Sequence, residues 1–386
     1  MKDNQAKYPQ LRFKGFTNPW DKRYLGDYVV DYTEKTTQEN QFPVLTSSQQ
    51  QGIVLQSEYF SDRQVTTDEN IGYFVLPRGY FTYRSRSDNN IFVFNRNDII
   101  DKGIISYFYP VFGLINADSN FFLRRINNGL NRQLAIAAEG TGQHVLSLKK
   151  FKKMETRFPS LPEQKQIGEF LECLDDLITV NQRKLAKLKE LKQGYLQKLF
   201  PRNGSKFPQL RFAGFADAWE QRKLGDITKI STGKLDANAM VENGKYDFYT
   251  SGIKKYRIDV AAFEGPSITI AGNGATVGYM HLADNKFNAY QRTYVLQEFL
   301  VDRSFIFSEI GNKLPKKIKQ EARTGNIPYI VMDMLTELKL SIPQNNSEQQ
   351  KIGSFFKQLD DTIDLHQRKL DLLKEQKKGF LQKMFV

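Results

Sequence analysis

The feature that most constrains the fold is an internal repeat. Residues 9–16 read PQLRFKGF and residues 208–215 read PQLRFAGF, an offset of 199 positions. The two tryptophans of the chain, Trp20 and Trp219, keep the same offset. Self-similarity at a fixed period indicates repeated structural units, and 386 residues are too many for one ordinary core. The chain is therefore expected to fold as two similar halves.

A second repeated block lies near the end of each half. Glu163-Gln164 returns as Glu348-Gln349, an offset of 185 positions. The intervening inserts, about residues 28–161 and 227–346, share little obvious identity. The sequence thus predicts two copies of one plan, in which a common frame carries divergent inserts.

Each half ends in a segment with helical periodicity. Residues 163–200 contain no proline and repeat apolar side chains at three-four spacing for about five heptads. Residues 348–385 repeat the pattern. Two long amphipathic helices are expected, each about 55 Å long at about 1.5 Å per residue. Internal two-fold symmetry favours an antiparallel coiled coil.

The centre of this predicted seam is polar. Asn181 and His366 occupy positions where a heptad calls for an apolar residue. A catalytic role is the alternative for His366, but no nucleophile pattern accompanies this residue in the sequence. A buried polar pair that sets the register of the two helices is the favoured interpretation.

The inserts alternate short runs rich in β-branched and aromatic residues with turns, as in residues 71–76, 79–83, 91–94 and 104–112. The predicted fold class is α+β, with two strand-rich domains, two long helices and a pseudo-two-fold repeat. The expected segments are residues 1–160, 161–201, 202–345 and 346–386.

Charge favours a polyanionic partner. The chain carries 56 Lys and Arg against 43 Asp and Glu, a net charge of +13. The excess of positive charge is compatible with a nucleic-acid partner or an anionic membrane surface. The alternative is a basic soluble protein with no such partner. A single cysteine, Cys173, excludes an intrachain disulfide. No signal peptide and no apolar run of membrane length are evident, so a cytoplasmic, soluble protein without membrane partners is expected.

Candidate DNA contacts in the first insert cluster at a strand-to-turn junction. Arginine and asparagine there offer the paired donors and acceptors that read guanine and adenine edges. A solvated basic turn is the alternative interpretation. The candidates are Tyr83, Arg84, Ser85, Arg86, Asn89 and Asn90.

The second insert mixes aromatic, amide and basic groups in several segments. Residues 267–278 superficially resemble a dinucleotide-binding fingerprint, but an apolar run follows the glycines where a helix should open. A tight strand-turn-strand is expected there instead. An ordinary polar edge is again the alternative to DNA contact. The candidates are Lys254, Lys255, Tyr256, Arg257, Asn273, Gln291, Arg292 and Thr293.

No catalytic or metal-binding pattern is evident in the sequence. There is no Walker A sequence, no Asn-Pro-Pro-Tyr sequence of an amino-methyltransferase, and no zinc-ligand spacing among the three histidines. The acidic pairs Asp175-Asp176 and Asp360-Asp361 lie beside the helix seam, where structural use is favoured over a nuclease site. A non-catalytic chain that binds no metal is expected.

Several blocks together carry a family resemblance. Residues 138–147 read AEGTGQHVLS and residues 161–168 read LPEQKQIG, followed by a long helix, and the PQLRF openings are paired. The chain resembles the specificity subunit of type I restriction-modification systems, the HsdS family. The second copy departs from this pattern at Arg323 and lacks the Leu-Pro before Glu348.

The resemblance implies function and partners beyond what the residues alone indicate. Two target-recognition domains would each read one half of a bipartite, asymmetric sequence in double-stranded DNA, held apart by the coiled coil. Two methyltransferase subunits would carry S-adenosylmethionine, and two restriction subunits would use ATP and Mg²⁺. This chain would bind none of those cofactors.

Two other interpretations remain open. The chain could be an assembly scaffold with a coiled coil and domains that bind nucleic acid without sequence preference. It could also be a fragment of a fused restriction enzyme. A specific reader keeps discriminating between duplexes as salt rises, whereas a non-specific binder shows only a salt dependence.

Overall fold

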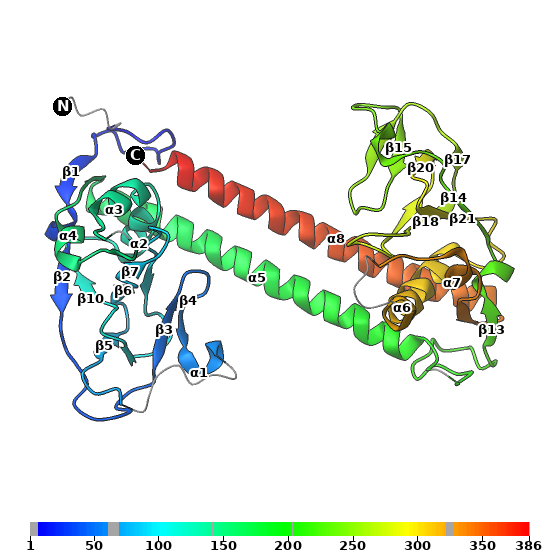
Figure 1. Ribbon diagram of the computed structural model, residues 1–386, viewed down its shortest axis with the longest axis horizontal. Helices are drawn as coiled ribbons and strands as arrows, with labels where there is room; N and C mark the ends of the chain where they lie inside the picture. The colour runs from blue at the N-terminus through cyan, green and yellow to red at the C-terminus, as the bar shows by residue number, and fades with distance from the viewer. Residues whose placement is uncertain (1–6, 61–68, 141, 203, 322–327, 386) are drawn as a thin grey trace. The chain divides into compact units, whose positions relative to one another are not determined.

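The computed structural model describes residues 7–60, 69–140, 142–202, 204–321 and 328–385, and it divides into two compact units (Figure 1). The first unit comprises Met1–Asn181 with Lys369–Val386, and the second comprises Gln182–Arg368. The expected segment boundaries at residues 160, 201 and 345 follow helix ends, whereas each compact unit takes in part of both long helices. Arg323 and residues 324–326, like Thr141, lie outside the described residues.

The two long helices are present as expected: α5 spans Leu161–Leu199 and α8 spans Asn346–Lys383. In the first unit, the ring of Phe170 in α5 meets that of Phe380 in α8 edge-on at 4.9 Å. In the second unit, Tyr195 meets Phe355 in the same way at 5.0 Å. Early residues of one helix thus face late residues of the other, so the helices are antiparallel, as predicted.

The repeated frame closes each unit with a two-stranded antiparallel pair. In the first unit β1 (Asp21–Tyr24) pairs β12 (Glu155–Phe158), and in the second β13 (Glu220–Lys223) pairs β22 (Lys339–Ile342). Trp20 and Trp219 precede the first strand of each pair and are buried in the core of their unit. Short 3-10 turns follow those strands: η1 (Leu25–Asp27) and η2 (Leu224–Asp226).

An N-terminal arm in each frame is held by a bidentate ion pair. Arg12 donates to both carboxylate oxygens of Glu163 at 2.7 Å, and Arg211 does the same to Glu348 at 2.7 and 2.8 Å. Both glutamates are only 1% exposed. The repeated PQLRF sequence is thereby explained, because its arginine neutralises a buried carboxylate at the start of a long helix.

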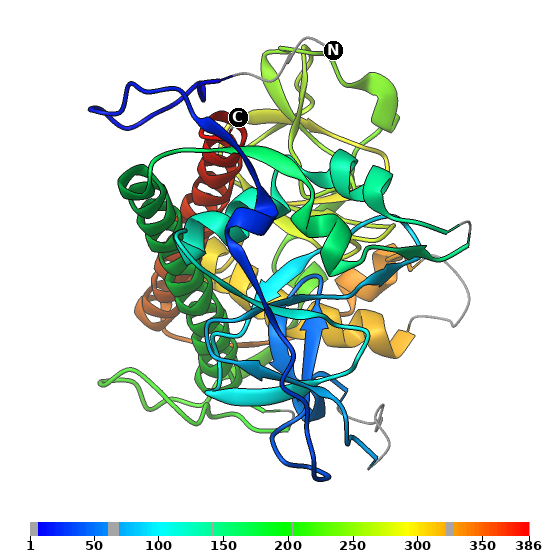
Figure 2. The ribbon, with the colours of Figure 1, turned by 90° about the vertical axis from the view of Figure 1, so that its left-hand side faces the viewer.

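Each insert contains a four-stranded sheet of the same topology, although the two insert sequences differ. The strand order is β2-β10-β6-β8 in the first unit and β14-β21-β18-β19 in the second. The first unit, in blue and cyan, faces the viewer in Figure 2. All neighbours in both sheets are antiparallel. The bounds are β2 (Val29–Tyr32), β6 (Phe81–Tyr83), β8 (Phe94–Arg96), β10 (Val111–Leu114), β14 (Lys229–Thr232), β18 (Ser267–Ala271), β19 (Met280–Ala283) and β21 (Thr293–Gln297).

The glycine-rich stretch at 267–278 is the expected strand-turn-strand. Its first part is β18, which pairs antiparallel with β19 after the turn. No helix follows the glycines, so the dinucleotide fingerprint is excluded.

The remaining strands differ between the units. The first has β3 (Leu45–Ser48) paired with β4 (Gly52–Leu55), β5 (Phe74–Pro77) with β9 (Lys102–Ile105), and β7 (Arg86–Ser87) with β11 (His144–Val145). The second has one sheet of order β16-β15-β20-β17, made of β15 (Tyr246–Tyr249), β16 (Tyr256–Ile258), β17 (Phe263–Glu264) and β20 (Lys286–Ala289). The inserts therefore diverge by what is added to a common sheet.

Each unit also contains shorter helices. Those of the first unit are α1 (Gln56–Tyr59), α2 (Ser119–Asn127), α3 (Asn131–Ala137) and α4 (Leu148–Lys152). Those of the second are η3 (Ala237–Ala239), α6 (Arg303–Glu321) and α7 (Met332–Thr336). Of these, α2 and α6 share a core with the four-stranded sheet and a long helix of their unit. Among the described residues, no helix combines the length and apolarity needed to cross a bilayer.

Candidate nucleic-acid interface

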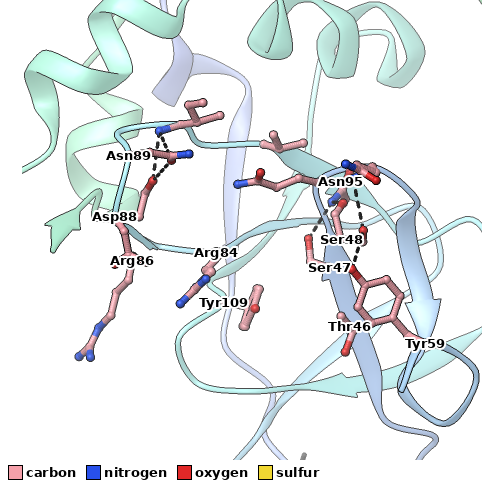
Figure 3. Close-up of a pocket in the computed structure, with 15 residues that line it drawn as sticks. Thr46, Ser47, Ser48, Tyr59, Arg84, Arg86, Asp88, Asn89, Asn95 and Tyr109 are labelled. Atoms are coloured by element: carbon pink, nitrogen blue, oxygen red, sulfur yellow. Dashed lines mark hydrogen bonds between the residues drawn. The ribbon is translucent and has the colours of Figure 1, made fainter. Parts of the chain in front are cut away.

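A polar cleft of about 560 Å³ lies in the first unit beside the predicted strand-to-turn junction (Figure 3). One wall is the β3–β4 hairpin, and the other is the segment that runs from the end of β6 through β7. Three of the candidates, Arg84, Arg86 and Asn89, line it together. The remaining lining residues include Thr46, Ser47, Ser48, Gln49, Gln50, Tyr59, Asp88, Asn95 and Tyr109.

Arg84 and Arg86 are exposed, and neither is in an ion pair with a described residue. By contrast, Arg78 and Arg96 of the same insert are bonded to Asp101 and Asp98. The Arg86 guanidinium stacks over the ring of Phe108 at 4.2 Å, which keeps its plane fixed while its donors stay accessible. The two arginines can therefore donate to phosphates or base edges.

The rest of the cleft is held by its own hydrogen bonds. Asn95 donates to the Ser47 hydroxyl at 2.8 Å and to the Ser48 carbonyl at 2.9 Å, which anchors the hairpin to β8. The Asn89 side chain accepts from the backbone N–H of Ile91 and from the Ser87 hydroxyl, which shapes the turn. The cleft is thus a formed surface with two free guanidinium groups at its edge.

The prediction is wrong for Tyr83. Its ring is fully buried in the aromatic core, where it lies 4.5 Å from the ring of Phe94, and its hydroxyl donates to the Leu146 carbonyl at 2.9 Å. Burial raises the pKa of the Tyr83 phenol far above its ordinary value. Successive strand residues point to opposite faces, so Tyr83 faces the core where Arg84 faces solvent.

Ser85 and Asn90 have structural roles in the same turn. The Ser85 hydroxyl donates to the Phe108 carbonyl at 2.6 Å. Asn90 adopts a left-handed backbone with φ of 60°, which asparagine tolerates better than most residues. Both are half-buried, so they shape the loop that presents the arginines.

In the second unit the candidates gather at one end of the β16-β15-β20-β17 sheet. Strands β15 and β20 are parallel, with Tyr249 opposite Ala289, so the loops after them leave from the same edge. One loop carries Lys254 and Lys255, and the other carries Gln291 and Arg292. These four are exposed, and no described ion pair involves them.

The lysines of this edge lie over aromatic rings. The Lys254 ammonium is 5.4 Å from the centre of the Tyr256 ring, and the Lys255 ammonium is 5.4 Å from that of Tyr249. Such contacts orient an ammonium group without neutralising it. Both lysines therefore remain available to a phosphate backbone.

Three other candidates of the second unit are either bonded to protein groups or buried. The Arg257 guanidinium bonds the carbonyls of Gly244 and Lys245 and pairs with Asp247, so it fixes a turn. The Asn273 side chain bonds the Ser251 hydroxyl. Thr293 is the first residue of β21 and is 1% exposed, so its prediction as a DNA contact is wrong.

Several lining residues of the first cleft were not predicted. Gln49 and Gln50 stand at the tip of the β3–β4 hairpin, and Tyr59 and Tyr109 come from segments distant in sequence. The run of three glutamines followed by Gly52 is a turn signal next to amides that could bond bases, and it was available in the sequence. The tyrosines had no local signal, because only the tertiary fold brings them to the cleft.

The predicted centre of the helix pair is partly polar. Asn181 is 5% exposed and donates to the Leu177 carbonyl of its own helix at 2.7 Å. His366 is half-buried, and its Nδ1 has no described partner. The two residues belong to different units, so their pairing stays a prediction.

Among the described residues, no group of three or more His, Cys, Asp or Glu side chains is placed to hold a metal ion. The exposed groups are guanidinium, ammonium and amide, which suit phosphates and base edges.

Comparison with known proteins identifies the family. Residues 19–190 and 216–375 each match the model of the type I restriction modification DNA specificity domain. The EcoDI specificity subunit of Escherichia coli is 34% identical over 147 residues, covering 37% of this chain and 32% of that protein. The MjaVIII specificity subunit of Methanocaldococcus jannaschii is 24% identical, covering 63% of this chain and 64% of that protein. The matches thus span a third to two thirds of these relatives.

Solved structures share the fold. The type I restriction-modification S subunit from M. genitalium superposes with a TM-score of 0.70 at 17% identity, covering 98% of this chain and 99% of that chain. A structure describing complex assembly and conformational transition of the type I R-M system gives 0.51 at 14% identity, covering 96% and 99%. With both halves of the chain matching the family model, this protein belongs to the family of the type I restriction modification DNA specificity domain, of which it carries two copies.

Proposed function

We propose that this chain is the DNA-reading, non-catalytic specificity subunit of a type I restriction-modification complex, in which each insert reads one half of a bipartite, asymmetric site. The observation that supports this proposal is that the two units share some structural elements and differ in others. The frame and the four-stranded sheet recur in both units. By contrast, β7, which carries Arg86, and the β15–β16 hairpin, whose loop carries Lys254 and Lys255, do not recur. Two readers built on one scaffold can recognise two different half-sites.

The reading groups are Arg84 and Arg86 in the first unit and Lys254, Lys255, Gln291 and Arg292 in the second. Arginine reads guanine through two hydrogen bonds, and glutamine reads adenine in the same way. The lysines and the net charge of +13 supply phosphate contacts that position the chain without sequence preference.

Equivalent apolar side chains exposed in both units support two identical partner subunits. Tyr8 and Phe207 are each 53% exposed at matching positions of the two arms, and Leu11 and Leu210 are 40% and 43% exposed. A repeated patch fits two copies of one protein. The proposed occupants are two methyltransferase subunits, with two restriction subunits in the full complex. S-adenosylmethionine, ATP and Mg²⁺ would be bound by these partners, in the cytoplasm.

The test begins with cells that carry this chain and its methyltransferase partner as their only modification system. The expected result is a single bipartite methylated motif. The purified complex should then keep its preference for a duplex with that motif over a scrambled duplex as salt rises. Equal affinity for the two duplexes at all salt concentrations would favour the assembly scaffold instead.

A further inference from the structure

The internal repeat aligns the two units residue by residue around the start of α2 and α6. Asp118 and Asp302 cap these helices, each accepting from the backbone N–H three residues on at 2.8 Å. Gln164 and Gln349 accept from the backbone N–H of those aspartates. Positions in α2 and α6 therefore correspond at an offset of 184, and those in α5 and α8 at 185.

In the first unit an arginine of α2 fills the space against α5. Arg124 donates through Nη2 to the Asp175 carboxylate at 2.7 Å and through Nη1 to the Asn120 carbonyl at 3.2 Å. Lys377 of α8 pairs with the same carboxylate. Asp175 thus has two cationic partners, one guanidinium and one ammonium.

In the second unit the arginine is missing and a cavity stands in its place. Ser308 corresponds to Arg124, and Gly311 corresponds to Asn127. Asp360 corresponds to Asp175 and keeps the ammonium partner, since Lys192 of α5 pairs with it. Both small residues and Asp360 line a cavity of about 610 Å³, called here the Asp360 cavity.

The Asp360 carboxylate is incompletely compensated. Burial raises its pKa above the ordinary value even though Lys192 opposes the shift, and nearby Asp364 and Asp361 raise it further. All three aspartates line the cavity. In the described part of the chain, Asp361 and Asp364 have no ion-pair partner.

Other groups around the cavity set its selectivity. Lys255, Lys357 and His281 also line it, and Lys255 already lies over the Tyr249 ring. Burial lowers the pKa of His281, which favours its neutral form. Tyr279 and Phe307 supply flat apolar surface, which a guanidinium stacks on more readily than an ammonium does.

We propose that the Asp360 cavity binds a guanidinium group, which takes the place that Arg124 fills in the first unit. The group could belong to a free arginine-like metabolite or to an arginine of a partner subunit, and the second source rests on the proposed function. The cavity volume suits a small ligand or a single side chain.

The test is calorimetric titration of the purified chain with agmatine at pH 8, with putrescine as the ammonium control. One saturable agmatine site is expected, with weaker putrescine binding. Ser308→Arg should supply the guanidinium internally, and Asp360→Asn should remove its acceptor, so each should weaken agmatine binding by about tenfold or more. Ser308→Ala leaves the cavity open and should bind as the unaltered chain does.

Thermal melting controls for folding of the variants. Ser308→Arg is expected to melt at or above the temperature of the unaltered chain, because the new guanidinium pairs with Asp360. Absence of saturable agmatine binding, or binding that neither Ser308→Arg nor Asp360→Asn weakens, would overturn the proposal.

A second arm separates the two sources. If a partner's arginine occupies the cavity, the assembled complex should no longer bind agmatine, and Ser308→Arg should weaken assembly. If the ligand is a free metabolite, chain and complex should bind agmatine equally. Either outcome supports the guanidinium site, and the second leaves the proposed function untouched.

Discussion

Replacing Arg12 by alanine should release the first N-terminal arm. Glu163 is 1% exposed and receives two hydrogen bonds from Arg12, whose own side chain is 14% exposed. Removing one partner of such a buried pair leaves an uncompensated charge, which costs about 3–5 kcal/mol. The arm's backbone contact should open as well, because the Leu11 N–H donates to the Lys383 carbonyl at 2.9 Å in the same unit.

The second arm provides a matched comparison. Trp20 Nε1 also donates to Glu163 at 3.3 Å, whereas Trp219 Nε1 is buried without a described partner. Glu348 therefore depends more on its arginine, and Arg211→Ala should destabilise its unit more than Arg12→Ala destabilises the first.

Hydrogen exchange read by mass spectrometry over residues 7–16 and 206–215, with urea unfolding, measures these effects. Each variant should accelerate exchange in its own arm only. The double change Arg12→Met with Glu163→Met should cost less than Arg12→Ala, because it leaves no buried charge. Unchanged exchange in residues 7–16 of Arg12→Ala would refute the reasoning.

Three further outcomes follow from the described contacts. Burial raises the pKa of Glu309 from 4.5 to about 7. Between these pH values the folded state therefore binds a proton that the unfolded state has lost. The free energy of unfolding should fall by up to about 3 kcal/mol as pH rises from 4.5 to 7. Glu309→Gln should abolish that slope in urea titrations, and an unchanged slope would contradict the assignment. A Cβ at Gly168 would lie 2.3 Å from the carboxylate of Asp118, which caps α2, so Gly168→Ala should destabilise the protein by about 1–2 kcal/mol. Gly379 of the same unit faces open space, so Gly379→Ala should be neutral or stabilising in the same unfolding assay. Arg84→Ala and Arg86→Ala should each reduce discrimination at the first half-site by about 1–3 kcal/mol in competition binding, and loss at both half-sites instead would argue against separate reading.

The repeat and the helices could be predicted because their signals are local. Octapeptides that match at seven of eight positions and a sustained three-four spacing require no tertiary information, and the structure shows both the repeated frame and the two long helices. The use of Arg12 and Arg211 could not be foreseen, because their partners Glu163 and Glu348 lie 151 and 137 residues away.

The common strand order of the two four-stranded sheets could not be predicted from the sequence either. Strand patterns record only which residues alternate between faces, and unrelated sequences satisfy the same pairing. The candidate site could be predicted only in part, because sequence patterns do not show which face of a strand is buried. Composition located the segments around Arg84 and Arg292, but the choice between core and solvent faces failed for Tyr83 and Thr293, where adjacent residues point in opposite directions.

The most direct measurement of the central claim is an insert exchange. Residues 28–154, which lie between η1 and β12, would be replaced by the matching segment of a relative, and methylated motifs would be mapped in cells that carry the chimaera and the methyltransferase partner. The account predicts that one half of the bipartite motif changes while the other half is retained. A change in both halves, or an unchanged motif, would contradict the assignment of one half-site to each insert.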